Sequence, residues 1–287
     1  MEKYYSFAGI DLCVAIPDEK MYTDDRHLTA FRRDAVADPH RFTFTMVEEL
    51  TPPSAACLFA DGGCRAYREG EAVACYYGSV GHDAEPAYMR VLHEGRRHSV
   101  QLRAGDVPGR VGVHIVLTAL GVEHLVVQQR GVILHASYVL TEDGAILFTA
   151  PSGTGKSTQA ELWRTLRGAE VVNGDRAVIR WQDGGPVACG LPFAGSSPYC
   201  RRATAPLRAV VYLGQAPETT ITRLGGVAAF RRIWEGCSLR TWDKADVALA
   251  SETVKRLVET VPVYNLNCLP DESAVIALER MLQGRGG

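Results

Sequence analysis

The sequence predicts an α/β (α+β) protein in which a β-rich N-terminal region precedes a core built around a phosphate-binding loop. Two observations lead to this prediction. In residues 1–106, short apolar or β-branched runs alternate with turn-forming residues, as in small antiparallel strands. In residues 107–287, an apolar run leads into a Gly-Lys-Ser loop and a helical stretch, and further strands and helices follow. We therefore expect two domains with these boundaries, and the sequence assigns no role to the first.

The composition is that of an ordinary globular protein. Hydrophobic residues make up 46% of the 287 residues and charged residues 22%, close to the usual averages. The 31 Lys and Arg nearly balance the 33 Asp and Glu, so charge gives no reason to expect nucleic acid or an anionic membrane as a partner. No apolar run approaches the ~20 residues that span a bilayer, and a signal-peptide pattern is missing. We expect a cytoplasmic protein, and homo-oligomerisation stays open.

The N-terminal region contains several predicted strands and no recognisable catalytic constellation. Strands are expected at residues 5–10, 41–47, 73–77 and 97–102. The histidines of this region are scattered along the sequence, so we expect them to be surface or hydrogen-bonded residues. They are His27, His40, His82, His93 and His98.

The elements that follow can be predicted from periodicity and turn chemistry. Apolar residues at helical spacing predict a helix over residues 111–128, with Gly121 as its weak point. A strand then begins at Val132, and an Asp-Gly turn at residues 143–144 predicts a hairpin into the strand before the loop. The remaining predictions are a helix at 159–166, strands at 170–173, 177–181, 209–213 and 263–266, a helical region at 226–260 and a C-terminal helix at 271–282.

Residues 150–158 have the composition of a phosphate-binding loop of the Walker A type. Small residues at the loop allow backbone N–H groups to curl around phosphate oxygens, and the following helix N-terminus adds a favourable dipole. The lysine can reach the outer phosphates, and the next hydroxyl can bind Mg²⁺. We predict that a nucleoside triphosphate and Mg²⁺ bind here. The expected binding residues are Ser152, Gly153, Thr154, Gly155, Lys156, Ser157 and Thr158.

Two further residues complete a candidate site for phosphoryl transfer. Asp175 ends a short apolar strand downstream of Lys156, where a carboxylate could face the metal; the alternative is a plain turn residue. His135 follows the apolar residues 132–134. On spacing alone, a histidine in this place is more often a hydrogen-bonded core residue than a catalytic one.

Three segments taken together resemble the HPr kinase/phosphorylase family, which is related in fold to the ATP-dependent phosphoenolpyruvate carboxykinases. They are residues 134–137, the loop at 150–158 and the turn at 173–176. A fourth segment, 189–197, is more similar to HPr-kinase-like proteins associated with peptide modification. The Glu-Ile-Arg-Gly signature of HPr kinases is absent.

The resemblance implies roles for individual residues. His135 takes the position of the family's active-site histidine, and Lys156 and Ser157 those of its phosphate and Mg²⁺ ligands. Asp175 matches the second Asp of the family's Asp-Asp-Arg turn, whereas Gly174 stands where the family has its first Asp. The catalytic residues are then Asp175, His135 and Lys156, with Ser157 and Asp175 at the metal.

The implied protein is a P-loop kinase with a strongly bent sheet flanked by helices. It would transfer the γ-phosphoryl of ATP to a hydroxyl, most simply a serine of a peptide or small protein. Three alternatives stay open: an HPr kinase/phosphorylase, a kinase for free serine or another small molecule, and a nucleotide-binding partner protein with weak catalysis. Gly174 is the reason for the last of these. Residues 190–197 would form either an acceptor-side flap or an ordinary structural loop.

Overall fold

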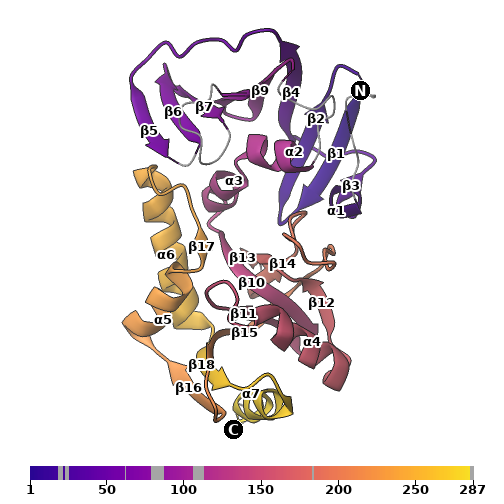
Figure 1. Cartoon of the computed structure of the whole chain (residues 1–287), viewed down its shortest axis with the longest axis vertical. Helices are drawn as coiled ribbons and strands as arrows, with labels where there is room; N and C mark the ends of the chain where they lie inside the picture. The colour runs from indigo at the N-terminus through magenta and orange to yellow at the C-terminus, as the bar shows by residue number, and fades with distance from the viewer. Residues whose placement is uncertain are drawn as a thin grey trace. The chain divides into compact units, whose positions relative to one another are not determined.

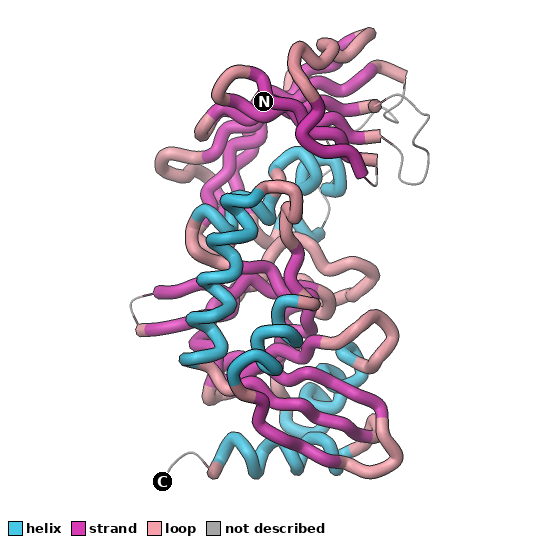
Figure 2. Tube along the Cα trace, turned by 90° about the vertical axis from the view of Figure 1, so that its left-hand side faces the viewer, coloured by secondary structure: helices cyan, strands magenta, loops and turns pink. Residues whose placement is uncertain are grey.

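The computed structural model describes residues 1–18, 22, 26–61, 63–78, 87–105, 113–182 and 184–284. The chain divides into two compact units, Met1–Val122 and Glu123–Gly287. Both units contain α-helices and many strands, so the fold is mixed α/β (Figure 2). The predicted domain boundary between residues 106 and 107 lies outside the described residues and stays a prediction.

The described part of the N-terminal unit forms a nine-stranded sheet in the order β3-β1-β2-β4-β9-β8-β7-β6-β5. The pairings of β2 with β4 and of β4 with β9 are parallel. The other pairings of this sheet are antiparallel, as predicted. The two parallel pairs join segments that are distant in sequence, so they leave no local turn signal. The elements are β1 (Glu2–Phe7), β2 (Ile10–Ala15), α1 (Arg26–Thr29), β3 (Arg32–Arg33), β4 (His40–Val47), β5 (Cys57–Asp61), β6 (Cys64–Glu69), β7 (Ala72–Tyr77), β8 (Met89–Glu94), β9 (Arg97–Arg103) and α2 (Val113–Leu120).

Three histidines that are scattered in sequence lie together in this sheet. His98 on β9 lies 3.2 Å from His40 and 3.1 Å from His93, measured between ring nitrogens. Its ring stacks on Phe42 with the centroids 4.1 Å apart. These contacts agree with the expectation of hydrogen-bonded histidines. His82 lies outside the described residues.

The helix predicted over residues 111–128 is two helices in the structure, α2 and α3 (Val122–Gln128). Between them Gly121 adopts a left-handed backbone with φ of 54°, which interrupts the helical hydrogen bonds. Residues 111 and 112 lie outside the described residues.

The helical region predicted at 226–260 is also interrupted. It consists of α5 (Gly226–Trp234), the two-residue strand β17 (Cys237–Ser238) and α6 (Lys244–Thr260). The second helix has its own start signal, because the Asp243 carboxylate accepts hydrogen bonds from the backbone N–H groups of Ala245 and Asp246.

The C-terminal unit contains a strongly bent sheet in the order β11-β10-β13-β14-β15-β18-β16. The long strands β10 and β15 change partners along their length. β10 pairs first with β13 and then with β11, and β15 pairs first with β14 and then in parallel with β11. As a result, five strands form a closed ring in the order β11-β10-β13-β14-β15, with β15 paired back to β11. The strands are β10 (Val132–Thr141), β11 (Gly144–Thr149), β12 (Glu170–Asn173), β13 (Arg176–Gln182), β14 (Gly185–Cys189), β15 (Thr204–Gln215), β16 (Thr220–Leu224) and β18 (Val263–Cys268).

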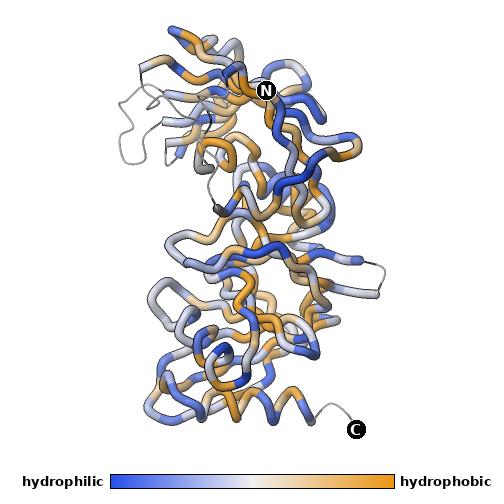
Figure 3. Tube along the Cα trace, turned by 90° about the vertical axis from the view of Figure 1, so that its right-hand side faces the viewer, coloured by the Kyte–Doolittle hydropathy of each residue, from blue (hydrophilic) through white to orange (hydrophobic). Residues whose placement is uncertain are grey.

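Helices cover both faces of this sheet. Successive residues of a strand point to opposite faces of the sheet, and here they enter two different buried clusters. Leu147 on β11 packs in the cluster that includes α5 and α6. The next residue, Phe148, packs in the cluster that includes α4 (Lys156–Arg167) and α7 (Glu272–Gln283). Figure 1 shows these helix pairs on opposite sides of the strands. The apolar positions of α7 recur between polar ones, as the colours of Figure 3 show. Within the described residues, no helix is long and apolar enough to cross a membrane.

Candidate functional site

The loop at residues 150–155 connects β11 to α4 in the strand–loop–helix order that phosphate binding requires. Gly153 and Gly155 have left-handed backbones, with φ of 79° and 115°. A Cβ at either position would meet nothing within 4 Å, so glycine is needed for backbone conformation and not for space. Lys156 and Ser157 are the first residues of α4, and their backbone N–H groups have no acceptor within the helix. The loop can thus present several N–H donors to an anion.

The Lys156 side chain folds back over the loop. Its Nζ donates hydrogen bonds to the carbonyl oxygens of Ala150 at 3.0 Å and Pro151 at 3.2 Å. The side chain is buried, and this burial lowers the pKa of Lys156, while the negative charge of Asp175 acts in the opposite direction. The ammonium group is therefore held at the loop, close to the charges of the site.

His135 and Asp175 are brought together by antiparallel pairing of β10 with β13. In this register His135 lies opposite Arg176. The distance from His135 Nδ1 to Asp175 Oδ1 is 3.5 Å, and Arg176 Nε donates to Asp175 Oδ2 at 3.2 Å. The guanidinium of Arg176 also stacks over the Phe193 ring, 4.3 Å from its centroid. Asp175 is thus held between an imidazole and a fixed cation.

The imidazole of His135 is shifted towards its neutral form. Burial lowers its pKa below the ordinary value of 6.5, and the charges of Lys156 and Arg176 act in the same direction. Asp175 opposes the shift without overcoming it. Since a lowered pKa favours the uncharged ring, His135 at neutral pH can accept a hydrogen bond or a proton.

Asn173 organises the turn that carries Asp175, and the sequence analysis did not select it. Its side chain is fully buried. The Asn173 Oδ1 accepts hydrogen bonds from the backbone N–H groups of Asp175 and Arg176, both at 2.9 Å. Its Nδ2 donates to the carbonyl oxygens of Leu191 and Phe193. An Asn at a strand end before Gly-Asp is typical of such a turn, and that signal could have identified it.

Gly174 has no room for a side chain. A Cβ at this position would lie 2.1 Å from Ser197 Oγ and 2.6 Å from Ser197 Cβ. Nearby, Gly195 has a φ of 53°, and a Cβ there would lie 3.2 Å from the carboxylate carbon of Asp175. The tip of the loop at residues 190–199 therefore lies directly against the turn, and Ser197 occupies the space that a longer residue at position 174 would need.

A cavity of about 550 Å³ joins these features. Eight of the predicted site residues line it: His135, Ser152, Gly153, Gly155, Lys156, Ser157, Thr158 and Asp175. Thr154 is the predicted residue that is not in the lining. The sequence analysis missed Glu161 on α4 and Tyr199 on the loop, which also line the cavity. Two hydrogen bonds lower the pKa of Glu161. The larger effect comes from Tyr199 and the next from Arg164.

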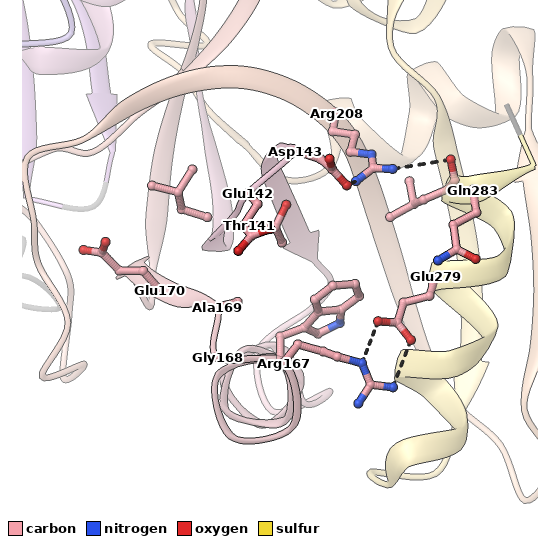
Figure 4. A pocket seen from close by; sticks show the side chains of 13 residues that line it. Thr141, Glu142, Asp143, Arg167, Gly168, Ala169, Glu170, Arg208, Glu279 and Gln283 are labelled. Atoms are coloured by element: carbon pink, nitrogen blue, oxygen red, sulfur yellow. Dashed lines mark hydrogen bonds and ion pairs between the residues drawn. The ribbon is translucent and has the colours of Figure 1, made fainter. Parts of the chain in front are cut away.

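Two other clusters lie apart from this cavity. A second cavity of about 520 Å³ is lined by charged residues that pair with one another, such as Arg167 with Glu279 and Arg208 with Asp143 (Figure 4). None of the predicted site residues lines it. In addition, ligand atoms of His124, Asp243 and Asp246 lie within 4.8 Å of one another. We therefore take the cavity beside the loop at residues 150–155 as the candidate site.

Comparisons with known proteins give little further information. No family model matches the chain, and no curated protein matches it. One matching solved structure is the Hpr(Ser) kinase/phosphatase from Coxiella burnetii. The two sequences are 10% identical, the match covers 54% of this chain and 99% of that chain, and the TM-score is 0.33. Because this similarity is low, the chemistry of the site has to be argued from its own geometry.

Proposed function

We propose that this protein is an ATP-dependent kinase that transfers the γ-phosphoryl group to a serine hydroxyl of a peptide or small protein. The observation that supports the proposal is the single cavity shared by the phosphate-binding loop and by the pair of His135 and Asp175. A phosphoryl-transfer site needs a phosphate cradle, an acidic group and space for an acceptor in one place. This cavity offers all three.

The loop and Lys156 would bind the triphosphate. Backbone N–H groups at the start of α4 would donate hydrogen bonds to the bound phosphates, and the helix dipole would add to this attraction. The ammonium of Lys156 is at present shared between two carbonyl oxygens. Phosphate oxygens are stronger acceptors for a charged donor, so we expect the side chain to turn towards a bound nucleotide.

The cavity also has oxygen ligands suitable for Mg²⁺. Ser157 supplies a hydroxyl and Asp175 a carboxylate, and both line the cavity; hard cations such as Mg²⁺ prefer such oxygens together with phosphate. When bound, Mg²⁺ would neutralise charge on the phosphates.

In the proposed reaction the acceptor hydroxyl attacks the γ-phosphorus. A bond forms between these atoms, the bond to the bridging oxygen breaks, and ADP leaves. The hydroxyl proton passes to Asp175, and the neutral ring of His135 positions the acceptor by a hydrogen bond. The role of His135 agrees with the neutral ring that burial and the neighbouring charges favour.

The experiment combines nucleotide binding with phosphoryl transfer. Purified protein with Mg²⁺ and ATP is offered a serine-containing peptide, HPr or free serine, and ADP and phosphorylated product are measured. We expect Lys156→Ala to lose nucleotide affinity, and Asp175→Asn to bind ATP but to transfer about 10²–10⁴-fold more slowly. Lys255→Ala, an exposed lysine of α6, is the matched control and should behave as wild type. A wild-type protein that binds ATP but neither transfers nor hydrolyses it with any hydroxyl acceptor would contradict the proposal.

One observation favours a second candidate, a nucleotide-binding partner protein with weak catalysis. Ser197 fills the space beside Gly174, so the turn carries a single carboxylate, Asp175. The same experiment separates the two candidates, because a partner protein binds the nucleotide without producing ADP.

A further inference from the structure

The loop at residues 190–199 is tied to the core at several points, although its glycines suggested mobility. The Gly190 N–H donates to the Ala203 carbonyl at 2.9 Å, and the Arg201 N–H donates to the Val172 carbonyl at 2.8 Å. Between these two ends of the loop, the side-chain amide of Asn173 donates hydrogen bonds to the carbonyl groups of Leu191 and Phe193. The tip of the loop, including Ser197, is therefore presented to the cavity by a fixed base.

The Ser197 hydroxyl lies among the groups of the proposed kinase site. Its Oγ lies beside the Cα of Gly174, in the space of the missing side chain, and a Cβ at Gly195 of the same tip would lie 3.2 Å from the carboxylate carbon of Asp175. Ser197 lines the same cavity as Lys156. Its Oγ accepts a hydrogen bond from the Tyr199 N–H at 3.2 Å, which uses a lone pair and leaves the hydroxyl proton free to be donated.

We propose that Ser197 is an internal phosphoryl acceptor, so that the protein phosphorylates its own loop. This inference rests on the proposed kinase function. The Ser197 Oγ forms a bond to the γ-phosphorus of ATP, the bond from that phosphorus to the bridging oxygen breaks, ADP leaves, and the hydroxyl proton passes to Asp175. The products are one phosphoserine and one ADP for each ATP.

Neighbouring hydroxyl groups are less suited to this role. Ser196 and Ser152 also line the cavity, but both are exposed, and no hydrogen bond from the described residues fixes either hydroxyl beside the acidic turn. Ser197 is half-buried and anchored. A phosphate on Ser197 would place its negative charge near the Asp175 carboxylate, and like charges repel. We therefore expect the modified loop to move away from the turn, which limits the reaction to one phosphate per chain.

The test uses the full chain with Mg²⁺ and ATP and without any added acceptor. Intact mass spectrometry should show the addition of one phosphoryl group, and fragmentation should place it on Ser197. The rate constant should not depend on protein concentration, because the acceptor belongs to the same chain. Ser197→Ala should lose the modification, Ser196→Ala should keep it, and Asp175→Asn should slow it by about 10²–10⁴-fold.

Two controls keep the result interpretable. Ser197→Ala removes a hydroxyl beside a glycine and introduces no clash, and its nucleotide binding and thermal unfolding are measured to confirm that it is folded. If the wild-type chain phosphorylates an added serine acceptor but stays unmodified itself, or is modified on Ser196, the inference is wrong and the proposed kinase function stands. If neither ADP nor a phosphorylated product forms with or without an added serine acceptor, both proposals fail.

Discussion

At the scale of single residues, the titration of His135 tests the electrostatics of the site. Its pKa is lowered first by burial and then by Lys156, and Asp175 opposes the shift. We expect its titration midpoint, followed by NMR of the imidazole ring, to lie below 6.5. Lys156→Ala removes a repelling cation and should raise the midpoint, whereas Asp175→Asn removes an attracting carboxylate and should lower it further. His135→Gln identifies the resonance.

The sign of the associated pH effect follows from the same shift. Because the folded protein prefers the neutral ring, the contribution of His135 to stability is present above pH 6.5 and is lost as pH falls towards the lower folded pKa. Shifts of the midpoint in one direction for both Lys156→Ala and Asp175→Asn would contradict this account.

The site also shows which residues can be predicted from sequence. Lys156 and Asp175 could be selected because loop chemistry and spacing are local signals, whereas His135 was selected only through the family resemblance. The structure brings all three to one cavity. Ser197 could not be ranked in this way, and the local signal of Asn173 identifies a turn residue without its contacts to the loop. Their importance comes from contacts between β12 and a loop more than fifteen residues later, and those contacts are set by tertiary packing.

At the scale of elements, the same distinction explains which strands and helices could be predicted. The hairpin of β10 and β11 has an Asp-Gly turn, and α7 has an Asp cap and a clear apolar face. By contrast, β14 and β16 were not predicted, and the parallel pairing of β11 with β15 has no local signal. The break inside residues 226–260 depends on β17 pairing with β10, which periodicity alone cannot show.

The contact between the acidic turn and the loop at 190–199 gives a prediction about these two elements. Gly174→Ala would place a Cβ 2.1 Å from Ser197 Oγ, so we expect a loss of about 1–3 kcal/mol in the free energy of unfolding. Ser197→Gly removes the obstructing atoms, and the double variant should recover most of that loss. Urea unfolding of the four proteins gives the coupling energy.

A matched control for this cycle is available on the same unit. A Cβ at Gly184 meets nothing within 4 Å, and no left-handed backbone is required there. Gly184→Ala should therefore change stability by less than about 0.5 kcal/mol, with or without Ser197→Gly. Independent, additive effects of Gly174→Ala and Ser197→Gly would show that the loop does not lie against the turn.

At the scale of the whole molecule, all the proposed site residues belong to the unit Glu123–Gly287. This unit has its own sheet and buried clusters on both faces of that sheet. A separate core is what allows a domain to fold by itself. We therefore expect a fragment of residues 123–287 to unfold cooperatively and to bind ATP and Mg²⁺ as tightly as the full chain.

A second fragment, residues 107–287, decides where the proposed nucleotide-binding domain begins. It adds α2, which the structure groups with the N-terminal unit and the sequence places in the kinase domain. Circular dichroism, thermal unfolding and nucleotide titration of both fragments are compared with the full chain. If residues 123–287 suffice, α2 is dispensable for the site. If only residues 107–287 fold and bind nucleotide, then α2 is part of the proposed kinase domain. If neither fragment binds nucleotide while the full chain does, the N-terminal unit is required for the site.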